Sequence, residues 1–168
     1  MKRFNIRCNL YPDEHQANAI KQHMGYVRYV WNHYASIAEQ WASHQTGQLT
    51  YPVFDELVAN NAEFLKDAIR PSIEHTMSTF IETNYQSRAP AFKRKRDKHQ
   101  MFFVPGSCAT IDFDTLLISL GHIKDITVEL HCQKPKYATL DNVLVEMENN
   151  KFFAKLMMHS YTVKKVKS

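Results

Sequence analysis

Nine histidines and one close pair of aspartates are the residues whose chemistry could bind a metal ion. The histidines occupy positions 15, 23, 33, 44, 75, 99, 122, 131 and 159, with no HExxH or HxH spacing and no cysteine pair beside them. Asp112 and Asp114 are two residues apart, and paired carboxylates can hold magnesium. They precede Thr115 in a turn-like sequence, where aspartate is favoured for local hydrogen bonding. We therefore expect a turn at this point and no metal site.

The motifs of phosphate-binding loops and of nucleophilic enzymes are missing from the sequence. It has four glycines and neither GxxxxGK[ST] nor GxGxxG. No serine or cysteine has the context of a nucleophile elbow. Cys8, Cys108 and Cys132 form no CxxC pair, which argues against a disulfide framework and favours a reducing, intracellular compartment. We expect no cofactor and no complete catalytic apparatus.

Positive charge is concentrated in one short stretch, which points to a polyanionic partner. The chain carries 21 Lys and Arg against 17 Asp and Glu, a net charge of +4. Residues 88–104 contain six basic residues and one acid, so the rest of the chain has a net charge of −1. Each cation that neutralises a phosphate releases counterions. The alternative is a solvated basic loop or a localisation-type signal.

Aromatic residues accompany these cations. Phe92 precedes Lys93, and Phe102 and Phe103 follow Lys98. Rings stack on unpaired bases while cations hold phosphates. The alternative is that Phe102 and Phe103 belong to the core of a strand. Adjacent residues of a strand face opposite sides, so at most one of the two rings fits this alternative cleanly. On the preceding helical stretch, Arg28 and Asn32 are four residues apart on one face, and Arg28 is the better candidate for a phosphate contact.

The elements that position these residues follow from hydrophobic periodicity. Residues 2–10 alternate apolar and polar, which predicts a half-buried strand, and Asp13 with Gln16 predicts a capping box. Residues 13–87 have helical spacing, interrupted at Gly25 and broken at 46–48, with Ile81 and Tyr85 on the buried face of the last helix. From 101 onward, short strands recur, and Asn149-Asn150 lies in a hairpin turn.

These patterns predict an α+β fold, a small wedge-like or OB-like β barrel with an inserted bundle of three to four helices. We assign residues 1–12 and 101–168 to the barrel, because the N-terminal strand has no local partner. We assign residues 13–100 to the helical insertion, which ends in the basic loop. No stretch approaches the ~18 apolar residues of a membrane span, so no membrane partner is expected.

The start of the chain resembles the TnpB family of transposon-encoded RNA-guided nucleases, which are similar to type V CRISPR effectors. The resemblance rests on the stretches 7–12 (RCNLYP), 25–32 (GYVRYVWN) and 88–96 (RAPAFKRKR). It extends at low identity to Phe102-Phe103, to 118–124 and to the strand that begins at Lys151. In that family a nuclease domain with a G-I-D-x-G motif follows, whereas this sequence ends at Ser168. The resemblance implies a recognition half without the nuclease and therefore no cleavage by this chain alone.

The resemblance also implies the partners and the binding residues. Expected partners are a structured, guide-type RNA, double-stranded DNA beside a short flanking motif, and a separate RuvC-like nuclease subunit or a host CRISPR effector, in the cytoplasm of a prokaryotic cell or infected host. Tyr51, Arg70, Glu74 and His75 fall where the family reads the flanking motif, although Arg70 is equally compatible with a surface role capping a helix. The expected nucleic-acid-binding residues are Arg28, Asn32, Tyr51, Arg70, Glu74, His75, Arg88, Phe92, Lys93, Arg94, Lys95, Arg96 and Lys98.

Three interpretations remain open on the sequence alone. The chain is a recognition module of a split effector, or a regulator or inhibitor of a CRISPR-type effector encoded by a phage or mobile element, or a transposon relic that folds but does little. A co-purified structured RNA is expected for the first two. A RuvC-like partner distinguishes the first, and an intact host effector complex distinguishes the second.

Overall fold

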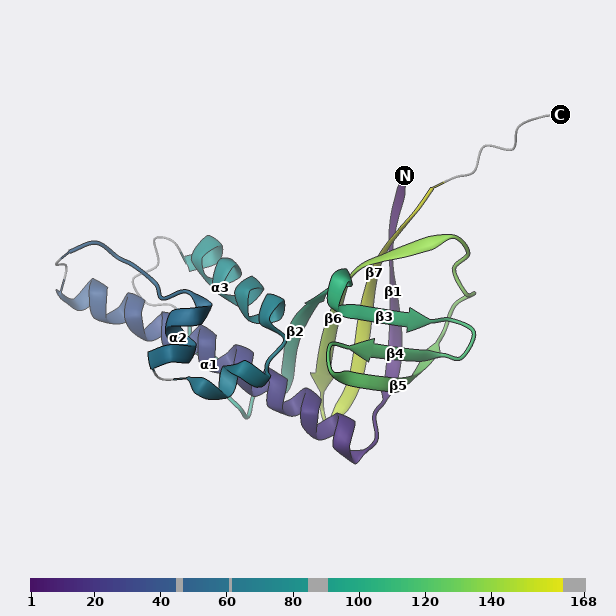
Figure 1. Ribbon diagram of the computed structural model, residues 1–168, viewed down its shortest axis with the longest axis horizontal. Coiled ribbons are helices and arrows are strands. Elements are labelled where there is room, and N and C mark those ends of the chain that lie inside the picture. The colour runs from purple at the N-terminus through teal and green to yellow at the C-terminus, as the bar shows by residue number, and fades with distance from the viewer. Residues whose placement is uncertain (45–46, 61, 85–90, 162–168) are drawn as a thin grey trace.

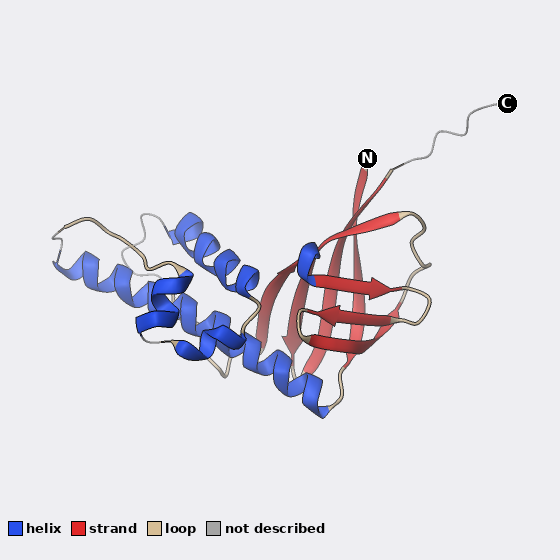
Figure 2. Ribbon diagram, viewed as in Figure 1, coloured by secondary structure: helices blue, strands red, loops and turns tan. Residues whose placement is uncertain are grey.

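The computed structural model describes residues 1–44, 47–60, 62–84 and 91–161 and confirms the α+β class (Figure 1). A seven-stranded antiparallel sheet forms a barrel-like layer, and the helices gather at one end of it (Figure 2). The helices are α1 (Glu14–His44), α2 (Phe54–Asn60) and α3 (Arg70–Asn84), with 3-10 turns η1 (Glu63–Asp67) and η2 (Gly106–Cys108). The strands are β1 (Lys2–Tyr11), β2 (His99–Pro105), β3 (Ala109–Asp112), β4 (Leu117–Leu120), β5 (Ile123–Leu130), β6 (Ala138–Glu148) and β7 (Lys151–Ser160).

The N-terminal strand lies in the middle of the sheet. The strand order is β2-β6-β7-β1-β5-β4-β3, and β1 pairs with both β7 and β5. Ile6, Cys8 and Leu10 are buried while the residues between them face outward, as the alternation predicted. Burial raises the pKa of the Cys8 thiol to about 11, which keeps it protonated at neutral pH. The partners of β1 all come from residues beyond 122, so the sheet closes over a long sequence separation.

The sheet is curled, so that its two ends come close to each other. β3, the last strand in the order, contacts β6, which is next to the opposite edge strand. Gly106 in η2 sits against the carbonyl oxygens of Leu140 and Asp141, where an added Cβ would lie only 2.5 Å from each. Glycine is required at this close approach. The barrel is therefore almost closed at the seam between β2 and β3.

Two local predictions from the sequence are confirmed in detail. The Asp13 amide donates to Gln16 Oε1 at 2.9 Å, and the Gln16 amide donates to Asp13 Oδ1 at 2.8 Å, which is a reciprocal capping box at the start of α1. Asn149 and Asn150 both have positive φ (51° and 60°), as a tight turn between β6 and β7 requires. Each feature depends on residues close together in the sequence.

The helical part differs from the prediction in two places. Gly25 does not interrupt the helix, because α1 runs unbroken from Glu14 to His44 and packs against β5, β2 and α3 along its length (Figure 1). Ile81 was expected on the buried face of α3, but it is 38% exposed, and Ile73, Met77 and Phe80 form that face. Tyr85 lies outside the described residues. Among the described residues, no helix has the length and hydropathy needed to cross a bilayer.

Candidate nucleic-acid interface

The basic segment, defined here as residues 91–98, is fixed to α1 through its backbone. The Trp31 indole Nε1 donates to the Ala91 carbonyl at 2.8 Å. Asn32 Nδ2 donates to the Lys93 carbonyl, and its Oδ1 accepts from the Lys93 amide, both at 2.8 Å. These three hydrogen bonds use main-chain atoms of the segment. They hold the segment in place without occupying its cationic side chains.

A turn inside the basic segment is stabilised by its single acid and by the first residues of β2. The Asp97 amide donates to the Arg94 carbonyl at 3.1 Å, and Asp97 Oδ2 accepts from the Arg94 amide at 2.9 Å. Gln100 Nε2 donates to the Lys95 carbonyl at 2.9 Å, and Arg28 Nη1 donates to Gln100 Oε1 at 2.7 Å. The turn is therefore linked to both β2 and α1.

The side chains of the basic segment point mostly to solvent. Within the described part of the chain, Arg94, Lys95, Arg96 and Lys98 form no ion pair. Phe92 is 46% exposed. Four cations and one ring thus surround an ordered turn. Exposed cations without carboxylate partners are the groups that neutralise phosphates with counterion release.

Lys93 differs from its basic neighbours. Its Nζ lies 4.2 Å from the centroid of the Trp31 ring, a cation–π contact. Much of the residue is exposed, but the ammonium is partly buried at the ring. This burial lowers the pKa of Lys93, and the negative charge of Asp97 opposes the shift. The Lys93 ammonium is therefore already in contact with a protein ring, whereas Arg94, Lys95, Arg96 and Lys98 are exposed.

Arg28 and Asn32 lie on one face of α1, as their spacing predicted, and the structure places this face beside the basic segment. The sequence did not reveal that they bind the protein itself. Both polar atoms of the Asn32 amide are used by Lys93, and Arg28 donates to Gln100. Their contribution to nucleic-acid binding stays a prediction, and the structure gives them a role in holding the segment. Arg88 lies outside the described residues.

Phe102 and Phe103 face opposite sides of β2 and both rings are used within the fold. Phe102 is buried, with its ring centroid 4.4 Å from that of His23. Phe103 stacks on His75 of α3 at 3.8 Å, and the Ser72 hydroxyl donates to the Phe103 carbonyl. Burial lowers the pKa of His75, and the charge of Glu82 opposes that shift. In the basic region, Phe92 rather than this pair offers an exposed ring.

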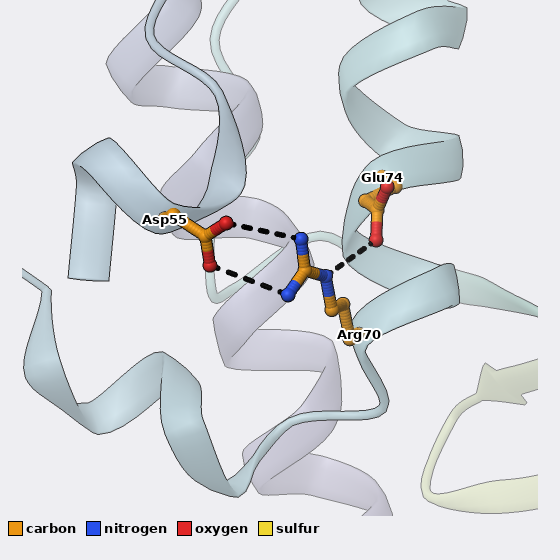
Figure 3. Close-up of polar contacts among 3 residues, drawn as sticks. All are labelled: Asp55, Arg70 and Glu74. Carbon is orange, nitrogen blue, oxygen red and sulfur yellow. Dashed lines mark hydrogen bonds and ion pairs between the residues drawn. The ribbon is translucent and has the colours of Figure 1, made fainter.

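Arg70, at the start of α3, forms a three-residue ion cluster (Figure 3). Its Nη1 and Nη2 donate to the two carboxylate oxygens of Asp55 at 3.2 and 3.3 Å, and its Nε donates to Glu74 at 2.8 Å. The guanidinium also lies 4.8 Å from the centroid of the Phe54 ring. About half of the side chain is exposed. The fork geometry that suits a guanine edge is here directed at a carboxylate.

Tyr51 packs inside an aromatic cluster between the helices. Its ring stacks on Tyr34 at 4.7 Å and meets Phe80 edge-on at 5.7 Å. Burial raises the pKa of Tyr51. Of the four residues expected to read a flanking motif, Arg70, Glu74 and His75 are exposed, whereas Tyr51 is half-buried. The structure thus places three of them on the surface of α3.

The two aspartates form the expected turn. Asp112 Oδ1 accepts from the amides of Asp114 and Thr115 at 2.8 and 3.1 Å. The bonds from Thr115 and then Asp114 lower the pKa of Asp112 below its ordinary value. Across the described ranges, no three or more His, Cys, Asp or Glu side chains are grouped closely enough to hold a metal ion.

Two residues that organise the interface were missed by sequence reasoning, Asp97 and Gln100. Asp97 has a signal, because an acidic side chain three residues after the start of a turn can accept from the amide at that start, as the N3 side chain of a capping box does. Gln100 has no signal in the sequence. Its side chain donates to two backbone carbonyls of the basic segment and accepts from Arg28 of α1, and only the folded chain brings these groups together. Asp97, the one acid of the basic segment, thus also stabilises the turn of the segment.

Comparison with known families gives one match. Residues 1–46 match the family model HTH_OrfB_IS605, described as a helix-turn-helix domain. In the structure, residues 1–44 of that stretch form β1 and the continuous helix α1. The match to the family model is therefore a similarity of sequence, and the structure of this stretch is not a helix-turn-helix. No curated protein matches the chain. The matched part contains two of the TnpB-like motifs, at 7–12 and 25–32, and not the one at 88–96. The description of the matched family suggests DNA binding in a transposon-related protein, although residues 1–44 contain one continuous helix and not two helices joined by a turn.

Proposed function

We propose that this chain is the recognition module of an RNA-guided system, which binds a structured guide-type RNA and the DNA beside its target without cleaving either. The observation that carries the proposal is the basic segment. Its backbone is fixed to α1 by Trp31 and Asn32, and four of its cations have no carboxylate partner in the described chain. Pre-ordering of the segment lowers the entropy lost on binding.

The form of the segment favours RNA as its ligand. Arg94, Lys95, Arg96 and Lys98 surround one turn, so they present a compact group of charges to a bent or folded backbone. An extended groove that follows a straight duplex would need charges spread along an element. The exposed ring of Phe92 adds a surface on which an unpaired base stacks. A folded transcript with loops supplies both features.

DNA binding in this proposal rests on the N-terminal match and on the exposed side of α3. The match of residues 1–46 to a helix-turn-helix family model supports DNA binding by the chain, although the matched stretch does not include α3. Arg70, Glu74 and His75 lie on the surface of α3 and carry groups that donate to or accept from base edges. The proposal assigns duplex contact to this helix and RNA contact to the basic segment.

The salt dependence of RNA binding tests the proposal. A double variant, Lys95→Ala with Arg96→Ala, removes two exposed cations, so the slope of log K against log[salt] should fall by about 1.4 to 1.8 units. The matched control is Lys21→Ala with Lys134→Ala, which removes two exposed lysines elsewhere. Binding is measured by fluorescence anisotropy with a labelled hairpin RNA. Equal slopes for both double variants would contradict the assignment of this segment.

The absence of cleavage is tested separately. The purified chain is incubated with labelled hairpin RNA and with duplex DNA in the presence of Mg²⁺ or Mn²⁺. Intact substrates are expected. Metal-dependent cleavage that co-purifies with the wild-type chain and is lost in Asp112→Ala would show that the carboxylates of this turn have a catalytic role and would overturn this part of the proposal.

A further inference from the structure

A small pocket lies between α1, the basic segment and the start of β2. Its volume is about 180 Å³. This is roughly six times the ~30 Å³ that one water molecule takes in the liquid. It is smaller than the ~300 Å³ at which pockets for drug-sized ligands begin. The pocket has room for one flat heterocycle and not for a complete nucleoside.

Part of the pocket lining is apolar. This part comes from Met24 and Val27 of α1 and from Met101 of β2. Met24 is 2% exposed and Met101 is 39% exposed, so the pocket runs from the protein core to the surface. Methionine side chains are flexible and polarisable, and they pack well against aromatic faces. A planar ring can pack against these apolar side chains while its polar edges face the charged part of the lining.

The polar part of the lining combines the cations of Arg28, Lys93 and Arg94 with one carboxylate, that of Asp97, and it also includes His99 and Gln100. Arg28 uses Nη1 to bind Gln100, and its Nη2 lies over Gly25, 3.5 Å from the position that a Cβ would occupy. Asp97 uses Oδ2 to accept from the Arg94 amide. Within the described residues Asp97 forms no ion pair.

We propose that this pocket binds one unpaired guanine base of the RNA. The inference rests on the proposed function and adds the base that the interface selects. The Watson–Crick edge of guanine offers N1–H and N2–H donors to a carboxylate, here that of Asp97. Its O6 and N7 accept from an arginine, the commonest specific contact to this base. Adenine and cytosine have neither the adjacent N1–H and N2–H donors nor the O6 and N7 acceptor pair, and uracil offers only one N3–H donor, so all three satisfy the polar groups of the pocket less completely.

Hairpin RNAs that differ only in one bulged nucleotide test the inference. The bulge is guanine, adenine, cytosine or uracil, and binding is measured by fluorescence anisotropy. The wild-type chain should bind the guanine bulge about tenfold more tightly than any other. Equal affinity for all four, within twofold, would overturn the inference and leave the proposed function intact. No binding of any hairpin would overturn both.

Two variants separate the pocket from the charge of the segment. Asp97→Asn keeps an oxygen that accepts from the Arg94 amide but removes the carboxylate, so the guanine preference should fall to less than twofold while the salt slope stays unchanged. Met101→Trp fills the pocket and should have the same effect. Lys95→Ala with Arg96→Ala should lower the slope and keep the preference. Retained preference in both pocket variants, with native circular dichroism spectra, would refute the assignment.

Discussion

Asn32 of α1 is joined to the main chain of Lys93 by two hydrogen bonds of 2.8 Å, one donated and one accepted by its side-chain amide. The two residues are 61 positions apart in the sequence. The pair fixes the backbone where the basic segment leaves the helices, and it places the Lys93 ammonium over the neighbouring Trp31 ring. The Asn32 side chain thus contributes two of the hydrogen bonds that position the basic segment, together with those of Trp31, Asp97 and Gln100.

Asn32→Ala should therefore loosen the basic segment. Two exposed hydrogen bonds are lost, and each contributes about 0.5–1.5 kcal/mol to stability, so the free energy of unfolding should fall by about 1–3 kcal/mol. RNA affinity should fall as well, because the cations lose their fixed arrangement. Urea unfolding and anisotropy with a hairpin RNA measure the two effects.

Asn18→Ala is the matched control for this variant, since Asn18 is exposed on the same helix. It should change neither stability nor affinity noticeably. If Asn32→Ala resembles this control in both measurements, the two hydrogen bonds do not order the segment in solution. If only affinity falls, the amide contacts the RNA itself, as the sequence suggested.

The parts of the fold that the sequence predicted are those encoded locally. The alternation of Ile6, Cys8 and Leu10, the capping box of Asp13 with Gln16 and the Asn149-Asn150 turn each involve neighbouring residues, and the structure has all three. The absence of a local partner for the first strand also placed β1 in the barrel. Periodicity and turn chemistry carry this information without any knowledge of distant contacts.

Long-range contacts explain where sequence reasoning was wrong or incomplete. A glycine in mid-helix weakens a helix, yet α1 continues through Gly25 because packing of the flanking turns against the sheet and α3 outweighs that preference. In the site, the sequence identified the cations and the Arg28–Asn32 face. The contact of Arg28 with Gln100 and that of Asn32 with the Lys93 backbone form only in the folded chain, so no residue spacing in the sequence predicts them.

Gly121 provides a second prediction, at the contact between the barrel and the helices. Its φ is +57°, and a Cβ at this position would lie 2.7 Å from the Cγ1 atom of Ile69. Gly121→Ala should therefore combine backbone strain with a clash and lower the free energy of unfolding by about 2–4 kcal/mol. Chemical denaturation gives the value.

Gly47→Ala is the matched control, because Gly47 also has a positive φ of +80° and nothing within 4 Å of the added Cβ. It should cost only the backbone strain, about 1 kcal/mol. Equal losses for the two alanine variants would show that Ile69 moves aside and that the junction is not tightly packed at this point.

His23 gives the protein a pH-dependent stability. It is 1% exposed, and its Nε2 accepts from the Ile69 amide at 2.9 Å, which requires the neutral ring. Burial, with a smaller effect of His122, lowers the pKa of His23 from 6.5 to about 4. Between these two values the unfolded chain binds a proton that the folded chain does not. Stability should therefore fall as the pH drops from 6.5 to 4, by up to about 3 kcal/mol, and then level off.

His23→Gln tests this origin, because the longer amide places an acceptor near the Nε2 position but does not titrate. Urea unfolding at pH 7 and at pH 4.5 should show a smaller pH effect in this variant than in the wild type. His15→Gln, at an exposed position of the same helix, should keep the full effect. An unchanged pH dependence in His23→Gln would assign it to other groups.

The ion cluster of Arg70 supplies the final prediction, on DNA. Asp55 and Glu74 hold the guanidinium, and the hydrogen bond to Glu74 is the main reason why the pKa of Arg70 is raised. If the same fork binds DNA, Asp55 competes with it. Arg70→Ala should weaken duplex binding about tenfold, whereas Asp55→Asn should strengthen it. Stability should change little in both variants, because exposed ion pairs contribute little.

Glu82→Gln distinguishes competition from simple charge. It removes one negative charge from an exposed position of α3, as Asp55→Asn removes one beside Arg70, but Glu82 does not contact the guanidinium. If both substitutions raise duplex affinity equally, Asp55 acts only through the overall field. If Asp55→Asn alone raises it, and the gain disappears when Arg70→Ala is added, then the carboxylate and the DNA bind the same guanidinium.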